Sequence, residues 1–159
     1  MNSTALHLPA DPAATERLGE RLGERLHPGD VVALVGDLGA GKTTLVRGLA
    51  RGLRVDDADA VQSPTYLLVL EHQGPVRLLH ADAYLPQKLL GFLADGGLEY
   101  LFDPTAVAVV EWAQHIAAHL PPRTLWVELA MAADGGRHVT LRPSQGGTFP
   151  WLAEMSKMA

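Results

Sequence analysis

The chain contains no cysteine, which excludes a disulfide framework, a thiolate nucleophile and a metal site built from thiolates. A reducing compartment is therefore permitted, and we expect the cytoplasm. The first residues lack a basic segment followed by an apolar run, and no stretch of about eighteen apolar residues occurs in the sequence. We therefore expect neither a signal peptide nor a membrane-spanning segment.

Positive charge is also scarce. The formal net charge is -5 at pH 7 and the sequence pI is about 5.7. Such a chain lacks the broad basic footprint with which proteins bind nucleic acid. We expect no DNA partner and only an indirect connection to RNA.

Disorder is excluded by the composition of the chain, which has 159 residues, 47% of them hydrophobic and 19% charged. No internal repeat and no linker rich in proline or glycine divides the sequence. We predict one domain over residues 1–159, with its core at about 8–142 and a helical tail at about 148–158.

Hydrophobic periodicity predicts helices that alternate with strands. Asp11 and Pro12 have the form of a helix N-cap and first turn, and leucines then recur at helical spacing up to Pro28-Gly29. Further helices are predicted at 44–53 and about 116–120, buried strands at 31–35 and 105–110, and antiparallel hairpins at 66–70 with 76–80 and 125–129 with 138–141. These elements predict an α/β fold with a mixed, mainly parallel sheet.

A glycine-rich motif lies between the strand at 31–35 and the helix at 44–53. It reads Gly36-Asp37-Leu38-Gly39-Ala40-Gly41-Lys42-Thr43 and fits the P-loop pattern in the context that pattern requires. Backbone N–H groups of such a loop surround phosphate oxygens, and the following helix points its positive end at the same anion. The motif therefore predicts a P-loop NTPase.

The side chains at the end of the motif have separate predicted roles. Lys42 would bridge the outer phosphates, Thr43 would place its hydroxyl on Mg²⁺, and Thr44 would bond an inner phosphate. Guanine-specific enzymes use an Asn-Lys-x-Asp motif, and Asn2 is the sole asparagine of the chain. ATP is therefore favoured over GTP.

Two acidic residues follow predicted strands and qualify as partners of Mg²⁺ or of the attacking water. Glu111 directly follows the apolar strand at 105–110, so its carboxylate would emerge at the sheet edge where open α/β sheets bind ligands. Asp82 lies just past the second strand of the first hairpin. The structural alternatives are an exposed helix cap for Glu111 and an N-cap or turn residue for Asp82.

Other polar and aromatic residues are less specific. Ser63-Pro64-Thr65 is on chemistry alone a turn with two available hydroxyls. His115 and His119 have a spacing that can bind zinc, but no third ligand is evident and zinc is disfavoured. Trp112 is either a core residue or, because it adjoins Glu111, a neighbour of the nucleotide.

Taken together, the motifs resemble the bacterial TsaE (YjeE) family. The resemblance covers about residues 8–142 and rests on the P-loop through Thr44 and on three further motifs with the same order and spacing, Ser63-Pro64-Thr65-Tyr66, His80-Ala81-Asp82-Ala83-Tyr84 and Glu111-Trp112. The family consists of small P-loop ATPases that work with a TsaB–TsaD complex to make threonylcarbamoyladenosine in tRNA.

The resemblance implies roles for individual residues. Thr43 and Glu111 become metal-site residues, and Asp82 becomes a catalytic or metal-shell carboxylate. Trp112 becomes a nucleotide contact and Thr65 part of a switch segment that senses phosphate. Thr15 and Arg137 are similar to peripheral nucleotide contacts of the family.

One departure concerns an arginine that usually follows the His-x-Asp-x-Tyr motif, where this chain has Leu85. Efficient P-loop enzymes commonly add an arginine that neutralises the transferring phosphate. Arg47 and Arg51 lie on the helix after the P-loop and Arg77 precedes an apolar strand, so none is placed for that role. We expect hydrolysis to be slow in the isolated chain and faster with its partner.

Two other functions remain open at this stage. A small-molecule kinase would share the P-loop, although no cluster of arginines resembles the lid that a kinase needs. A nucleotide-gated binding module without appreciable hydrolysis would carry the same motifs. Phosphate release from ATP, with and without partner proteins, distinguishes these functions.

Overall fold

The computed structural model of the chain describes residues 3–145 and 147–158. Seven strands form one mixed sheet in the order β1-β7-β6-β2-β5-β4-β3. The strands are β1 (Thr4–Leu8), β2 (Val31–Val35), β3 (Val69–His72), β4 (Arg77–Asp82), β5 (Ala106–Glu111), β6 (Thr124–Met131) and β7 (Arg137–Pro143). The predicted α/β class and both predicted hairpins, β3 with β4 and β6 with β7, are confirmed.

The centre of the sheet is parallel and its ends are antiparallel. β2 pairs in parallel with β5 and β6, and β4 pairs in parallel with β5. The pairs β1–β7, β6–β7 and β3–β4 are antiparallel. The description "mainly parallel" therefore holds only for the central strands, because β1 and the two hairpins add as many antiparallel pairings.

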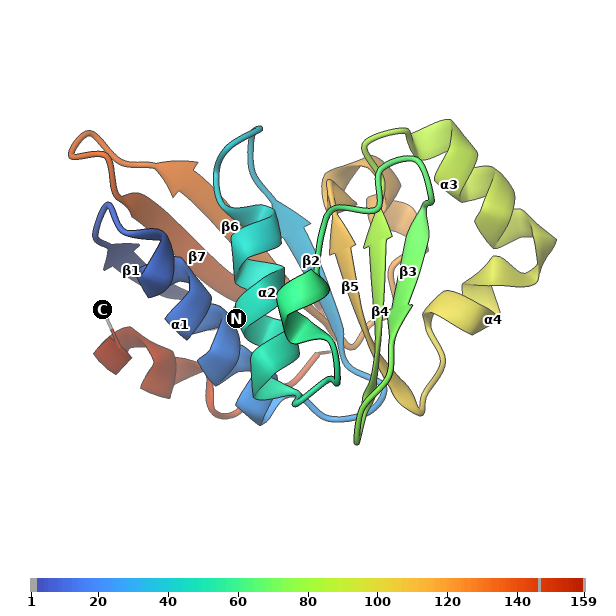
Figure 1. Cartoon of the computed structure of the whole chain (residues 1–159), viewed down its shortest axis with the longest axis horizontal. Helices are drawn as coiled ribbons and strands as arrows, with labels where there is room; N and C mark the ends of the chain where they lie inside the picture. The colour runs from blue at the N-terminus through green and yellow to red at the C-terminus, as the bar shows by residue number, and fades with distance from the viewer. Residues whose placement is uncertain (1–2, 146, 159) are drawn as a thin grey trace.

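Helices cover both faces of the sheet. α1 (Pro12–Arg25) and α2 (Lys42–Gly52) lie side by side across one face, and α3 (Pro86–Phe92) and α4 (Leu98–Leu101) lie at the β3 end (Figure 1). The sheet separates two hydrophobic cores, and successive side chains of a strand point alternately into one core and the other. Val32 and Leu34 of β2 pack in the core with α1 and α2, while Val31 and Ala33 pack in the core on the opposite face. Among the described residues, no helix is both long and apolar enough to span a membrane.

α1 begins as the sequence predicts. The Asp11 side chain accepts a hydrogen bond from the Ala13 N–H at 3.0 Å, and Pro12 occupies the first turn. Leu18 and Leu22 are buried on the face toward the sheet. α2 begins at Lys42, two residues before the predicted start, because the P-loop leads directly into its first turn.

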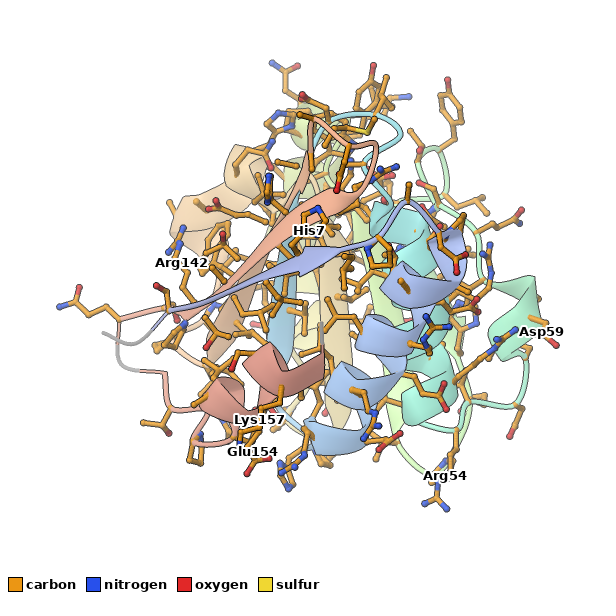
Figure 2. All side chains as sticks on the ribbon, turned by 90° about the vertical axis from the view of Figure 1, so that its left-hand side faces the viewer. His7, Arg54, Asp59, Arg142, Glu154 and Lys157 are labelled. Carbon is orange, nitrogen blue, oxygen red and sulfur yellow. The ribbon has the colours of Figure 1, made fainter. Side chains whose placement is uncertain are left out.

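A 3₁₀ helix at Leu152–Met158 ends the described chain. It occupies part of the expected helical tail, and residues 148–151 precede it without helical structure. Leu152 and Met155 are buried in the same core as α1, and Arg25 of α1 donates a hydrogen bond to Glu154. Figure 2 shows this helix, with Glu154 and Lys157 labelled, beside the lower end of α1. The core boundaries of about 8 and 142 stay a prediction.

One strand was missed and two local expectations were wrong. β1 was not predicted, although Thr4–Leu8 alternates buried and exposed side chains in the way an edge strand does. The strand expected at 66–70 begins instead at Val69, because the preceding segment turns toward β4 and Leu68 has a φ of +69°. The helix expected at 116–120 is a 3₁₀ helix, Ala113–His119, which is interrupted at Ile116.

α1 and α2 contact each other through glycines at a distance that no side chain permits. A Cβ on Gly48 would lie 1.9 Å from the Glu16 carbonyl oxygen, and a Cβ on Gly19 would lie 2.2 Å from the Leu45 carbonyl oxygen. Gly23 and Gly52 face equally close backbone atoms. The two backbones therefore pack directly, and this packing brings the N-terminal turn of α1 against the P-loop.

We expect Gly48→Ala to lower the free energy of unfolding by about 1–3 kcal/mol, because the added methyl group forces the helices apart. This is the net loss, after the roughly 1 kcal/mol by which alanine favours a helix over glycine is subtracted from the cost of a Cβ placed 1.9 Å from a backbone oxygen. Gly91→Ala on α3 is the matched control, since a Cβ there meets nothing within 4 Å. Urea denaturation measures both variants, and equal stability of the two would contradict the proposed packing constraint.

Candidate functional site

Most of the predicted site residues meet at the carboxyl edge of the central parallel strands. Glu111, the last residue of β5, pairs with Leu34 of β2 and with Asp82 of β4. Gly36, the first residue of the P-loop, follows β2 directly. A cavity of about 520 Å³ opens at this edge and is lined by Leu38, Gly39, Gly41, Lys42, Thr43, Thr44, Ser63, Thr65, Tyr66, Asp82, Tyr84, Glu111 and Trp112.

The P-loop backbone requires glycine at specific positions. Gly39 and Gly41 have φ values of +80° and +106°, in the left-handed region that glycine adopts at little cost. Gly36 has a different constraint, because a Cβ there would lie 2.8 Å from the Leu129 carbonyl oxygen on β6. α2 starts at Lys42, so its N-terminal end lies at the cavity. Backbone N–H groups in the first turn of a helix have no partner within the helix, and they stabilise an anion placed at that end.

Lys42, the first residue of α2, is almost fully buried and lines the cavity. Its Nζ donates hydrogen bonds to the carbonyl oxygens of Gly36 and Asp37, the latter at 2.9 Å, and lies 4.4 Å from the centre of the Trp112 ring. Burial lowers the pKa of Lys42 from its ordinary value, and the negative charges of Glu111, Asp82 and Asp37 oppose that shift. The ammonium group is thus surrounded by electron-rich partners from the same loop and from β4 and β5.

Glu111 is a buried carboxylate, 3% exposed, that faces the start of α2. The Thr43 hydroxyl lies 3.2 Å and 3.3 Å from its two carboxylate oxygens. The Nε2 atom of His80 lies 2.6 Å from Oε2 of the same carboxylate. These contacts exclude the alternative of an exposed helix cap, and they place a hydroxyl and a carboxylate side by side beneath the phosphate loop.

Asp82 is buried beside Glu111 and uses its two oxygens differently. Oδ1 accepts a hydrogen bond from the Tyr84 N–H at 2.8 Å, which is the turn role that the sequence left open. Oδ2 accepts the hydroxyls of Ser63 at 2.6 Å and Thr65 at 2.9 Å. The Ser63-Pro64-Thr65 segment is therefore bonded to the strand-end carboxylate, which explains why β3 starts later than predicted.

Aromatic side chains form one wall of the site. Trp112 has a φ of +57°, an uncommon conformation for a residue with a side chain, and its ring lies 5.2 Å from that of Tyr84 and 5.6 Å from that of His115. The Nδ1 atom of His115 lies 2.8 Å from the Ala83 carbonyl oxygen. His115 is thus engaged with the turn after β4 and with the Trp112 ring.

Thr15 and Arg137 lie on the opposite side of the P-loop. They line a second cavity of about 330 Å³ that shares Gly39, Gly41 and Thr44 with the first. Arg137 donates hydrogen bonds to the carbonyl oxygens of Ala40 at 2.8 Å and Gly39 at 3.1 Å. It also bonds the carbonyl oxygens of Gly135 and Gly136, so its guanidinium group joins the P-loop to the turn between β6 and β7.

Four residues at the site, Ser63, Tyr66, His80 and Tyr84, were not among the predicted site residues. Ser63 and Tyr84 belong to motifs that were noted, and each contacts Asp82 through its hydroxyl or its backbone N–H. His80 also belongs to a noted motif but was given no role; its contact with Glu111 could have been identified from strand periodicity, because residues 80 and 82 share one face of β4. The signal was the spacing of His80 and Asp82 within one apolar strand.

Comparisons with known proteins agree with one another. The family model described as "Threonylcarbamoyl adenosine biosynthesis protein TsaE" matches residues 9–139. The TsaE proteins of Treponema pallidum and Streptomyces coelicolor are 39% and 40% identical over 127 and 132 residues, which cover 80% and 78% of this chain and 92% and 86% of those proteins. The crystal structure of Bacillus subtilis YdiB superimposes with a TM-score of 0.76 at 30% identity and covers 98% of this chain and 95% of that one.

Proposed function

Because the chain belongs to the TsaE family of tRNA threonylcarbamoyladenosine biosynthesis proteins, we propose that it is a Mg²⁺-dependent ATPase that acts with a TsaB–TsaD-like complex. The observation that carries the proposal is the contact between Thr43 and Glu111 at the base of the P-loop. A hydroxyl and a strand-end carboxylate in this relation are the protein groups that hold Mg²⁺ in P-loop enzymes.

The donor set fits magnesium. Thr43 and Glu111 offer oxygen atoms, which Mg²⁺ prefers, and Asp82 offers a further carboxylate that can hold a water ligand. Among the described residues no group of three or more His, Asp or Glu side chains forms a metal cage. This suits an ion that takes its other ligands from phosphate and water, and the bound ion would supply charge neutralisation at the phosphates.

The chain's own residues divide the remaining tasks. We assign phosphate binding to the P-loop amides, Lys42 and Thr44, and the placement of the attacking water to Asp82. The nucleoside would extend over the second cavity beside Thr15, while Arg137 holds the loop that contacts the phosphates. Trp112 would contact the nucleotide from the side of β5, since it lines the first cavity and lies over Lys42.

Thr65 would sense the γ-phosphate. Its hydroxyl bonds Asp82 in this structure and lines the cavity, so a phosphate or metal-bound water that recruits Asp82 would compete for the same oxygen. The exposed side chains next to it, Tyr66 at 84% and Leu67 at 68%, would then move with the nucleotide state. This arrangement supports a nucleotide-dependent contact with the partner complex.

The partner is also expected to supply what the cavity lacks. No arginine is found among the residues that line it within the described chain, and Leu85 stands where the family usually has arginine. The net charge of -5 is unfavourable for direct tRNA binding, so the tRNA would be held by the partner, in the cytoplasm where tRNA is modified.

We expect the isolated chain to hydrolyse ATP far more slowly than a typical enzyme at about 10 per second. Addition of the TsaB–TsaD complex of the same organism is expected to raise turnover by at least about tenfold, because an arginine supplied in trans is a strong catalyst of phosphoryl transfer. Steady-state phosphate release during a titration with the complex measures this.

Two comparisons make the experiment decisive. A preparation of Glu111→Ala, treated identically, reports contaminating ATPase activity. Fast turnover by the chain alone, with no response to the complex, would reject the accessory role and favour an independent ATPase or a kinase.

A further inference from the structure

His80 is a fully buried histidine for which the proposed function gives no role. It lies on β4 with 0% of its surface exposed, between Leu70 of β3 and Val109 of β5. Its Nε2 atom lies 2.6 Å from Oε2 of Glu111. Burial of an imidazole is costly unless its polar atoms form hydrogen bonds. Apolar packing alone therefore does not account for a histidine at this position, and its contact with Glu111 needs an explanation.

The polar capacity of the His80 ring is directed at Glu111 alone. A carboxylate only accepts hydrogen bonds, so Nε2 carries the proton and donates it. The other nitrogen, Nδ1, is buried and has no partner among the described residues. The buried His72 of β3 likewise uses one ring nitrogen, toward Asp57, and has no partner for the other among the described residues, so what distinguishes His80 is that its single partner is Glu111.

The two hydrogen-bond partners of the Glu111 carboxylate, Thr43 and His80, have different relations to the proposed metal. The Thr43 contact joins the two proposed metal ligands to each other, and its distances of 3.2 Å and 3.3 Å are longer than that to His80. The His80 contact comes from outside this pair. If Thr43 and Glu111 both bind a cation, their contact with each other is replaced, whereas the hydrogen bond from His80 to Glu111 can persist.

We propose that His80 is a positioning residue, which holds the Glu111 carboxylate toward Thr43 so that both present oxygen atoms to the magnesium-nucleotide complex. The inference rests on the proposed function, because it assigns Glu111 to the metal. A glutamate side chain has several rotatable bonds, and a short hydrogen bond from a rigid strand position removes that freedom before the ion arrives.

The test uses three variants that separate the hydrogen bond from the packing. His80→Gln can place an amide N–H near the position of Nε2, whereas His80→Asn is shorter and reaches only the position of Nδ1. His80→Leu fills the space without a donor. His72→Asn is the matched control, because His72 is also a buried strand histidine but bonds Asp57, which is not among the residues of the cavity.

The affinity for ADP is measured first in EDTA and then during a titration with Mg²⁺. We expect His80→Asn and His80→Leu to need about 10- to 100-fold more Mg²⁺ for the metal-dependent change in affinity, which is the usual effect of removing an outer-shell partner. Affinity in EDTA should stay near the wild-type value. His80→Gln and His72→Asn should keep the wild-type Mg²⁺ requirement.

An unchanged Mg²⁺ requirement in His80→Asn and His80→Leu would overturn the proposal, as would an equal loss of affinity in EDTA, since the latter indicates a general defect of the site. If the wild-type protein binds no nucleotide, the proposed function fails; if it binds nucleotide without responding to Mg²⁺, the positioning role fails with the metal assignment.

A second measurement does not depend on variants that fold. Nitrogen-15 NMR of the imidazole rings in the wild-type protein, without nucleotide or metal, reports the tautomer of each histidine. We expect His80 to carry its proton on Nε2. A proton on Nδ1 instead would mean that His80 does not donate to Glu111, and it would overturn the proposal.

Discussion

Replacement of Glu111 by alanine is expected to lower ATP turnover by about 100- to 1,000-fold, the usual cost of removing a group that stabilises the transition state. Nucleotide affinity in the absence of metal should change much less, because we assign phosphate binding to the P-loop amides and Lys42. Glu111 is suited to this role since it is buried and lies next to Thr43 at the end of β5. Asp82→Ala should change turnover in the same direction.

Glu128 provides a matched control for this prediction. It pairs with Val35 across β2 and β6 much as Glu111 pairs with Leu34 across β2 and β5, but its side chain contacts Arg142 and does not line the cavity. Single-turnover hydrolysis and equilibrium binding should be measured for both alanine variants. Equal turnover in Glu111→Ala and Glu128→Ala would remove Glu111 from the reaction.

The part of the site that residue patterns alone predict is mostly local in the chain, whereas Thr15, Thr65 and Arg137 were assigned to the site only through the family resemblance. The strand at 31–35, the P-loop and the helix after it are contiguous, and each is specified by its own short pattern of apolar or glycine residues. Glu111 and Asp82 were also predictable. Each follows an apolar strand, and parallel strands in an α/β sheet end at one common edge.

The remaining features depend on contacts between distant segments. Thr65 contacts Asp82 only because the intervening chain folds back. The same contact accompanies the late start of β3, which begins at Val69 and not at residue 66 as predicted. Arg137 reaches the P-loop from a hairpin almost a hundred residues away in sequence. No local pattern encodes these meetings, so composition and periodicity could not predict them.

The packing of α1 and α2 connects the fold to the site. The glycine contacts set the separation of the helices, and α2 is the helix to whose first turn we assign phosphate binding. Thr15 of α1 consequently lies with its methyl group 3.5 Å from the position of a Cβ on Gly41. A substitution that separates the helices should therefore disturb the nucleotide site as well as the stability of the chain.

Lys42→Ala is expected to weaken ATP binding by about two orders of magnitude, because each charge-assisted hydrogen bond to a phosphate contributes about 1.5–3 kcal/mol. In this structure the ammonium group bonds carbonyl oxygens of its own loop, so it is already held at the loop mouth before a phosphate arrives. Burial lowers its pKa, and an incoming polyphosphate would favour the charged form.

The control for Lys42→Ala is Lys88→Ala, the same substitution at an exposed position on α3 outside the cavity. Calorimetric titration with ATP, together with thermal unfolding of both variants, separates lost affinity from lost structure. The two lysines differ in what the charge faces: Lys42 faces the carbonyl oxygens of the glycine-rich loop, and Lys88 faces solvent. Wild-type affinity in a folded Lys42→Ala protein would show that the glycine-rich loop does not bind phosphate through this side chain, and the assignment of a P-loop ATPase would then be wrong.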